Sequence, residues 1–254
     1  MPNDKSRKTI TRRDALGTLG ALGVMTLVGA RPLRAKTIRG SCTLAPKQTI
    51  GPYFVDEGLK RSDIRQGTGS DTVFITGAVP LYLSIDTVST TSPGCPPLRN
   101  VQIDLWHCHA GGLYSDEQAN GTLGQNWLRG YQMTDENGRV SFTTIYPGWY
   151  PGRTIHIHLM ARYYNSVGNT TYQFTTQLYF DDSISDTVLA NYPYNTRGDR
   201  TTTNANDGIF ASSMILDVQP TDGGKAYTGA IALGLALEDN ALADVIFDDG
   251  FEIS

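Results

Sequence analysis

The chain has 254 residues, of which 39% are hydrophobic and 18% are charged, a composition typical of a globular protein with one sizeable domain. Its 27 glycines, 12 prolines and 13 tyrosines, spread among short polar–apolar alternations, favour an all-β fold. The net charge of −4 argues against a nucleic-acid partner, and no segment is long and apolar enough to predict a membrane span.

The first 35 residues are set apart by their sequence. The stretch "SRKTITRRDALGTLGALGVMTLVGA" has a basic start, the pair Arg12 and Arg13, and then a short apolar run rich in glycine. This order is typical of a twin-arginine export leader, and the alternative is a tail that holds two arginines by chance. Residues 1–35 carry seven basic and two acidic residues, so the rest of the chain has a net charge of −9. We expect an acidic protein in the periplasm or outside the cell.

Three cysteines follow the leader: Cys42, Cys95 and Cys108. In an oxidising compartment two of them are expected to pair and to leave one thiol free. Cys42 is the preferred partner of one of the other two, between which the sequence does not decide. The absence of a CxxC spacing disfavours a metal site made of all three.

From residue 71 onwards, short stretches alternate apolar and polar residues, as half-buried strands do. The predicted strands lie around Val73 and Ile75, around Leu81, Leu83 and Ile85, and in "NVQIDLWHCH", "RTIHIHLMARYY", "YQFTTQLYF" and "TGAIALGLAL". The Asn-Gly pair at 137–138 predicts a hairpin turn that feeds a further strand. Several short strands separated by turns predict an all-β sandwich over residues 36–240.

Other segments interrupt this pattern. Residues 36–70 read as irregular, and "TIGPYFVDEG" within them as a structured loop. A helical turn or two is expected within residues 181–193, and residues 194–214 read as a long polar loop of the kind that carries function. Residues 241–254 form an acidic tail.

All four histidines lie in two HxH pairs, His107/His109 and His156/His158. Because side chains alternate along a strand, each pair is expected to point to one face. His156 and His158 would face away from the apolar stripe that contains Ile157, into solvent or into a site. The turn "PGWYPGR" just before them would fix Tyr150 nearby.

Imidazole binds several transition metals and selects none of them. A phenolate ligand is more selective, because its pKa of about 10 requires a strong Lewis acid. Iron(III) is therefore the natural candidate for a site that combines Tyr150 with the two histidines.

The stretches "DLWHCHAGGLYS", "TDENGRVSFTTIYPGWYPGRTIHIH" and "TTQLYF", preceded by "TIGPYFVD", resemble the intradiol ring-cleavage dioxygenases that act on catechol and protocatechuate. The resemblance runs in order from about residue 42 to residue 180. It implies a β-sandwich with a mononuclear non-haem iron(III), dioxygen and a catechol-type substrate as reactants, and a cis,cis-muconate-type product. It also implies a role in the catabolism of aromatic compounds.

The same resemblance assigns residues. Its metal ligands fall on Tyr114, Tyr150, His156 and His158. Tyr150 would also accept a substrate proton, Arg153 would stabilise charge on the ring and contact substrate, and Gln177 would support Arg153 or the ligands. Tyr53, in "GPYF", would line the substrate pocket. His107 is expected to be packed or hydrogen-bonded, and His109 to lie at a strand end or pocket rim, with neither bound to the metal.

The sequence also departs from the family. The turn between Tyr150 and His156 is shorter than in the cytoplasmic members, and "RTIHIH" replaces the usual "RPAHIH". These features resemble the exported, single-domain branch and leave the ring substituents of the substrate open. The oligomeric state is also open, and no stable membrane association is expected after removal of the leader.

Two other functions fit the same sequence. Four histidines from the two HxH pairs could bind zinc or copper, which would make His107 and His109 essential. Alternatively, a non-catalytic sandwich could bind aromatics or carbohydrate on a platform of Trp127, Tyr131 and Trp149. Essential tyrosines and a red-brown colour would distinguish the iron dioxygenase from both.

Overall fold

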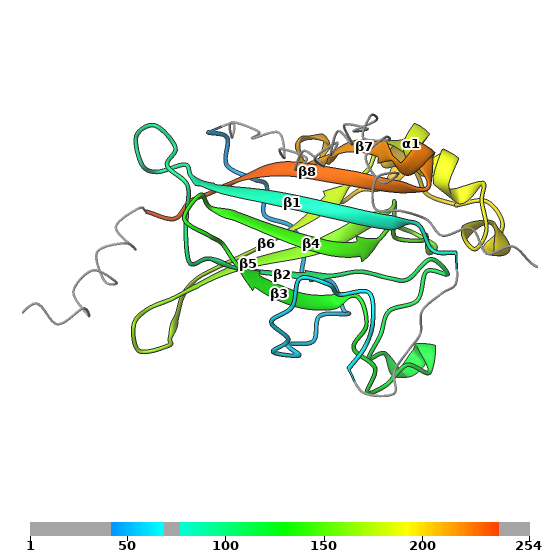
Figure 1. Cartoon of the computed structure of the whole chain (residues 1–254), viewed down its shortest axis with the longest axis horizontal. Helices are drawn as coiled ribbons and strands as arrows, with labels where there is room; N and C mark the ends of the chain where they lie inside the picture. The colour runs from blue at the N-terminus through cyan, green and yellow to red at the C-terminus, as the bar shows by residue number, and fades with distance from the viewer. Residues whose placement is uncertain (1–41, 69–76, 239–254) are drawn as a thin grey trace, which may run out of the picture. The chain divides into compact units, whose positions relative to one another are not determined.

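The computed structural model describes residues 42–68 and 77–238. In this part of the chain eight strands form two four-stranded sheets, in the orders β4–β1–β8–β7 and β3–β2–β5–β6 (Figure 1). The strands are β1 Pro80–Ser89, β2 Gln102–Trp106, β3 Arg129–Met133, β4 Arg139–Ile145, β5 His156–Tyr164, β6 Thr170–Tyr179, β7 Asp217–Thr221 and β8 Ala226–Leu235. Strands β1 and β8 pair in parallel, and the other neighbours are antiparallel.

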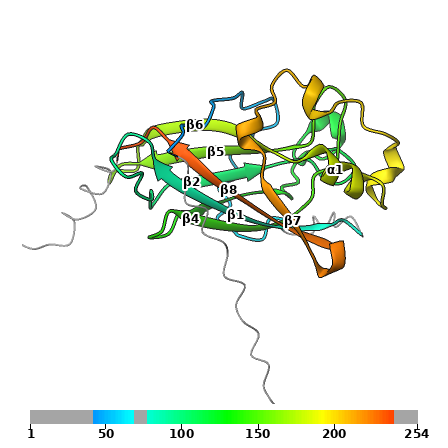
Figure 2. The same ribbon diagram turned by 90° about the horizontal axis from the view of Figure 1, so that it is seen from above.

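The two sheets pack face to face, as the polar–apolar alternation requires. Seen from above, β1 and β8 run obliquely across β2 and β5 in the other layer (Figure 2). Leu81 and Ile85 of β1 and Ile157 and Leu159 of β5 have no exposed surface and belong to one core between the sheets. The prediction of an all-β sandwich is confirmed.

One strand pairing differs from the sequence-based expectation. The turn at 137–138 forms, and Gly138 adopts a positive φ of 70°. The flanking strands do not form a hairpin, however, because β3 pairs with β2 whereas β4 pairs with β1 in the other sheet. The turn therefore carries the chain from one layer of the sandwich to the other. A turn signal fixes where the chain reverses, but burial of two apolar faces decides which strand becomes the neighbour.

Helix is scarce in the described residues. The helix α1 spans Asp182–Leu189, and the Asp181 side chain caps it by accepting a hydrogen bond from Ser183 N. The loop 194–214 holds three one-turn helices, η2 Tyr194–Arg197, η3 Asn204–Asn206 and η4 Ser212–Met214. Two further one-turn helices are η1 Gln118–Asn120 and η5 Asp222–Gly224. Within residues 42–68 and 77–238, no helix has the length and apolar character to cross a membrane.

Three expectations lie outside the described residues. These are the leader of residues 1–35, the strand around Val73 and Ile75, and the acidic tail of residues 241–254.

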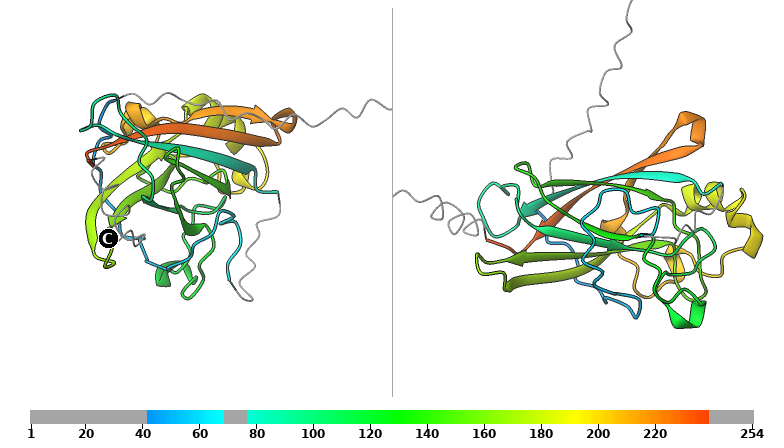
Figure 3. Two further views of the ribbon diagram at one scale, coloured as in Figure 1. Left: turned by 60° about the vertical axis from the view of Figure 1, so that its left-hand side comes forward. Right: turned by 60° about the horizontal axis from the view of Figure 1, so that its bottom comes forward.

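Residues 42–68, called the covering segment below, contain no helix or strand. The segment begins beside β8, where Leu44 forms a bridge with Gly234, and ends beside β4, where Asp63 forms a bridge with Thr143. Its middle part crosses the outer face of the β3–β2–β5–β6 sheet (Figure 3). Gln48 N donates to Thr175 O of β6 over 2.8 Å, and Lys60 forms an isolated bridge with Tyr131 of β3. The outer face of this sheet is therefore buried beneath the covering segment. The site described next lies there, opposite the core between the sheets.

Candidate metal centre and active site

Strand β5 presents His156 and His158 on the outer face of its sheet, because Ile157 and Leu159 occupy the core face. Both histidines are nonetheless buried, with 2% and 1% of their surface exposed. The His158 ring stacks on that of Trp106, its cross-strand neighbour on β2, with centroids 4.9 Å apart. The pair faces an enclosed site and not solvent.

Three of the four predicted ligands present their donor atoms to one point. The Tyr150 hydroxyl lies 3.1 Å from His156 Nε2, which lies 3.2 Å from His158 Nε2. Two donors that each lie about 2.1 Å from one metal ion at a near-right angle are separated by roughly 3 Å. Tyr150 reaches this point because residues 150–153 form a tight turn, closed by a bridge between Tyr150 and Arg153.

Tyr114, the fourth predicted ligand, approaches from the loop after β2. Its ring centroid lies 5.8 Å from that of Tyr150 and 6.2 Å from that of His158. The hydroxyl of Tyr114 is buried and makes no hydrogen bond of normal geometry to any of the described residues. A buried phenol without a partner costs free energy unless a ligand completes it, and a metal ion would do so.

The protonation of the donors suits a metal. The His156 ring donates from Nδ1 to Thr154 O over 2.7 Å, which leaves the Nε2 lone pair directed at the site. Burial, and then the charge of Arg153, lowers the pKa of His156 to about 3. Burial, followed by His156, lowers the pKa of His158 well below its usual value. Both rings are therefore neutral at pH 7, the form in which imidazole binds metals.

The two phenols behave in the opposite way. Burial raises the pKa of Tyr114 well above 10, and it also raises the pKa of Tyr150. Only a strong Lewis acid would hold both as phenolates in so enclosed a place. The donor set of two phenols and two neutral imidazoles therefore fits a single ferric ion.

Apolar side chains surround the donors on this outer face. Trp106, Cys108, Tyr114 and Met160 form a small buried cluster, separate from the core between the sheets. Four partly buried side chains pack against this cluster: Ile50, Tyr53, Phe54 and Tyr150. Electrostatic interactions are strong in a site so largely enclosed by apolar side chains.

Arg153 is held beside the donors by partners on two other segments. Its Nη2 donates to Gln177 Oε1 over 2.5 Å, and its Nε donates to Asp207 Oδ2 over 2.9 Å. Gln177 has no exposed surface and donates from Nε2 to Thr49 O of the covering segment. The sequence singled out Arg153 and Gln177 but not Asp207, because one Asp in a polar loop carries no signal of what it contacts.

The covering segment closes the site from outside. The Tyr53 ring stacks on the Tyr114 ring with centroids 4.4 Å apart, and its edge meets Tyr150 at 6.3 Å. Arg129 Nη1 donates to Tyr53 O over 2.7 Å and so fixes this part of the segment. Gly51 lies against His158, a contact that the sequence did not indicate. Tyr53 thus lies next to both phenols, where it was expected to line a substrate pocket.

His107 and His109 lie away from the donors. Strand β2 ends at Trp106, so the period-two argument does not apply to this pair. His107 binds Thr144 Oγ1 through Nε2 over 2.6 Å and Cys108 O through Nδ1 over 2.8 Å. His109 accepts from Gly111 N, and its ring stacks on Trp127.

The alternative functions find little support in this geometry. In the described part of the chain, no three His, Cys, Asp or Glu side chains come together as a metal site, which disfavours the four-histidine zinc or copper centre. Trp127 and Trp149 are 1% and 7% exposed, and Tyr131 is half-buried. These three side chains do not form an exposed aromatic platform.

The cysteines pair as Cys42 with Cys95, and their Cα atoms lie 5.7 Å apart. Cys108 is a buried free thiol whose Sγ contacts Gly148 O. Burial raises the pKa of this thiol to about 12. The disulfide ties the start of the covering segment to the connection between β1 and β2.

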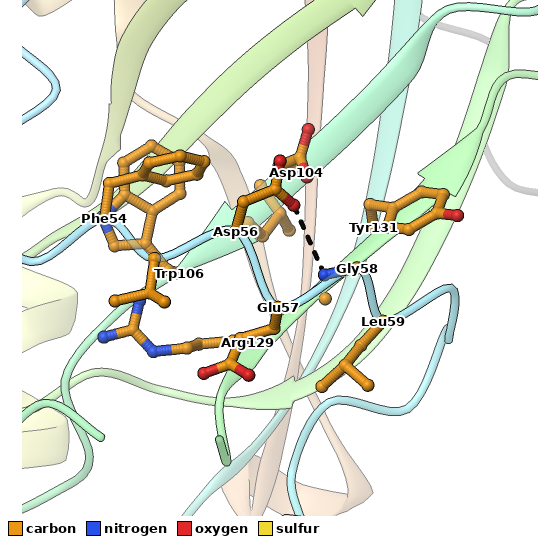
Figure 4. A pocket seen from close by; sticks show the side chains of 12 residues that line it. Phe54, Asp56, Glu57, Gly58, Leu59, Asp104, Trp106, Arg129 and Tyr131 are labelled. Carbon is orange, nitrogen blue, oxygen red and sulfur yellow. Dashed lines mark hydrogen bonds between the residues drawn. The ribbon is translucent and has the colours of Figure 1, made fainter. Parts of the chain in front are cut away.

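A separate pocket lies between residues 54–59 of the covering segment and strands β2 and β3 (Figure 4). Asp56, Glu57, Asp104 and Arg129 surround it, and Asp56 accepts a hydrogen bond from Gly58 N. None of the four predicted metal ligands lines this pocket.

Comparison with known proteins gives consistent matches. The sequence profile of a family described as "Dioxygenase" matches residues 51–197. The chain is 30% identical over 159 residues to the protocatechuate 3,4-dioxygenase beta chain of Burkholderia cepacia. That alignment covers 58% of this chain and 58% of the relative, so the chain spans less than two thirds of the curated relative's length.

Two solved structures share the fold over most of the chain. An intradiol ring-cleavage dioxygenase from Tetranychus urticae superposes with a TM-score of 0.64 at 29% identity, covering 78% of this chain and 97% of that one. The second is the dioxygenase domain of a dioxygenase–carbohydrate-binding protein fusion from Streptomyces sp. SirexAA-E. It superposes with a TM-score of 0.55 at 28% identity, covering 77% of this chain and all of that one.

Proposed function

The chain belongs to the intradiol ring-cleavage dioxygenase family, and we propose that it cleaves a catechol-type aromatic ring with dioxygen. In this reaction the bond between the two hydroxyl-bearing carbons breaks and both oxygen atoms of O₂ enter the product. A catechol thereby becomes a cis,cis-muconate-type dicarboxylic acid. One observation carries the proposal: two phenols and two neutral imidazoles meet in a buried, apolar site beside a fixed arginine.

Tyr114, Tyr150, His156 and His158 would hold a mononuclear non-haem iron(III), which supplies Lewis acidity toward the diol and reactivity toward dioxygen. Tyr114 is 2% exposed and stacked under Tyr53, whereas Tyr150 is only half-buried. The Tyr150 hydroxyl is therefore the better placed of the two to accept a proton from an incoming diol.

Arg153 would stabilise negative charge that develops on the ring, as a donor already fixed before the reaction begins. Its side chain is 15% exposed, and Gln177 and Asp207 hold two of its three nitrogens. Tyr53 would contact the ring of the substrate from the covering segment. The polar groups of this chain thus orient the substrate, while the apolar cluster around them excludes water.

A visible spectrum tests this function. The iron-loaded protein is expected to absorb visible light through tyrosinate-to-iron(III) charge transfer, and catechol added without dioxygen should shift the band to longer wavelength. Tyr114→Phe and Tyr150→Phe should each change or abolish the band and lower the rate of dioxygen uptake at least 100-fold, as expected when a group essential to catalysis is lost. Tyr146→Phe, which alters a buried tyrosine that binds Ser185, serves as the control.

Two results would reject the proposal. One is iron bound in stoichiometric amount without the charge-transfer band. The other is a spectrum that neither Tyr114→Phe nor Tyr150→Phe alters.

We further propose that residues 1–35 direct export through the twin-arginine pathway and that the protein acts in the periplasm or outside the cell. The Cys42–Cys95 disulfide supports this location, because such bonds persist in oxidising compartments. The twin-arginine route carries folded proteins, which suits an enzyme that takes up its metal before export.

A further inference from the structure

We infer that Asp207 is a positioning residue that orients both Arg153 and the turn leading to His156; this rests on the proposed function of the site. Asp207 belongs to the loop 194–214, between η3 and η4. Only 1% of its side chain is exposed, although the loop around it is polar. A carboxylate buried to this degree is stable only when charged and hydrogen-bonding partners surround it.

The partners of Asp207 use both carboxylate oxygens. Oδ2 accepts from Arg153 Nε over 2.9 Å and from Thr154 N over 2.8 Å. Oδ1 accepts from Ile209 N over 2.8 Å, within the same loop. Two backbone N–H groups therefore fix the carboxylate, and the fixed carboxylate in turn holds the guanidinium.

Arg153 is anchored along two edges. Asp207 binds Nε, and Gln177 binds Nη2 over 2.5 Å. Because a guanidinium is planar, two anchors in different directions fix the orientation of the whole group. Neither of these two anchors uses the third nitrogen, Nη1. Gln177 alone would leave the group free to rotate about a single contact.

The bond to Thr154 N acts on the metal donors by a second route. Thr154 O accepts the hydrogen bond from His156 Nδ1 over 2.7 Å, and this bond selects the tautomer of the ring. The backbone N–H group of Thr154 thus binds Asp207, and its backbone carbonyl group binds His156. Asp207 acts on the site through residues 153 and 154 and is itself not a ligand.

A simpler role would be to hold the loop in place, and Asp182 provides the comparison. The carboxylate of Asp182 accepts from Asn204 N and pairs with Arg200, so it also holds this loop. It makes no contact with Arg153. A loss of activity that came only from a loosened loop would therefore appear in both Asp182→Asn and Asp207→Asn.

The experiment compares Asp207→Asn, Asp182→Asn and Asp199→Asn, the last changing an exposed carboxylate of the same loop. Asparagine has one carbonyl oxygen and cannot satisfy Arg153, Thr154 and Ile209 together. We expect Asp207→Asn to lower kcat for catechol about 10- to 100-fold while iron content and Tm match those of Asp182→Asn. Asp182→Asn and Asp199→Asn should keep wild-type kcat. Wild-type kcat in Asp207→Asn, or an equal loss in Asp182→Asn, overturns the inference.

A double-mutant cycle with Arg153→Gln tests the route. Because one of the two routes runs through Arg153, the double variant is expected to lose less kcat than the two single losses combined, whereas fully additive losses contradict the inference. A crystal structure of metal-free Asp207→Asn gives a readout that needs no activity, since the Arg153 guanidinium should turn about its remaining contact with Gln177. An unmoved guanidinium overturns the inference. A wild-type protein that consumes no dioxygen with any catechol instead rejects the proposed function.

Discussion

The two HxH pairs look alike in the sequence and behave differently in the fold. His156 and His158 are both part of β5, so alternation places them side by side on one face. His107 follows the last residue of β2 and turns to Thr144 of the opposite sheet. The motif therefore predicts a shared face only where the strand continues through both histidines.

The buried His107 makes the stability of the protein depend on pH. Burial lowers its pKa to about 4, from 6.5 in the unfolded chain. As the pH falls below about 6.5 the unfolded chain takes up a proton, whereas the folded protein does so only near pH 4. The contribution of His107 to stability is full at pH 7 and is lost across this window, by up to about 3 kcal/mol.

Urea unfolding of the metal-free protein between pH 7 and pH 4 measures this loss. The free energy of unfolding of the wild type should fall by about 3 kcal/mol more than that of His107→Gln, which cannot take up the proton. Parallel curves for the two proteins would show that His107 does not carry this dependence.

Two glycines of the covering segment have similar backbone conformations, but only one of them contacts a proposed metal ligand. Gly51 and Gly58 adopt left-handed φ values of +72° and +62°. A Cβ at Gly51 would lie 3.0 Å from Cε1 of His158, whereas a Cβ at Gly58 would meet no atom within 4 Å. Alanine at either position costs about 1–2 kcal/mol in backbone strain. Only Gly51→Ala also pushes against a metal donor.

We therefore expect both Gly51→Ala and Gly58→Ala to lower the free energy of unfolding, and Gly51→Ala to lower it more because its Cβ also meets His158. Gly51→Ala should in addition reduce iron content and lower dioxygen uptake at least tenfold, while Gly58→Ala keeps both. Metal analysis and an oxygen electrode provide the measurements. Equal iron content and activity in the two variants would mean that Gly51 does not lie against His158 in solution.

The strands were largely predictable because alternation is a local property. Leu81 to Ile85 and His156 to Leu159 show it directly. The contacts of Gly51 and Asp207 were not predictable, because both belong to segments without periodicity whose course only the folded chain defines. The four proposed ligands came from a resemblance to a known family, and the structure brings their side chains together.

Across the two sheets, pairing depends on residues far apart in the sequence. The parallel neighbours β1 and β8 are separated by most of the domain, and no local signal at residues 80–89 indicates that partner. The same holds for the separation of β3 from β4 into different sheets. Sequence patterns thus predicted the sandwich architecture but not its strand order.

Export and disulfide formation should depend on each other if the protein leaves the cytoplasm. Replacing Arg12 and Arg13 by lysine is expected to keep the protein in the cytoplasm, where Cys42 and Cys95 stay reduced. The retained protein should then show three reactive thiols after denaturation, against one in the exported wild type. Arg31→Lys with Arg34→Lys, which preserves the twin arginine, is the control. Unchanged export of the Arg12→Lys/Arg13→Lys variant would contradict the leader assignment.

Strand β5 contributes to both the core and the proposed metal site, because its odd-numbered and even-numbered positions face opposite sides of the sheet. Ile157 and Leu159 face the interior of the sandwich, while His156 and His158 face the covering segment. An engineer could therefore vary Tyr53 and its neighbours, which face the donors, to seek new substrates while leaving the packed interior unchanged. Repacking of the interior for thermostability could likewise proceed without redesign of the reactive face.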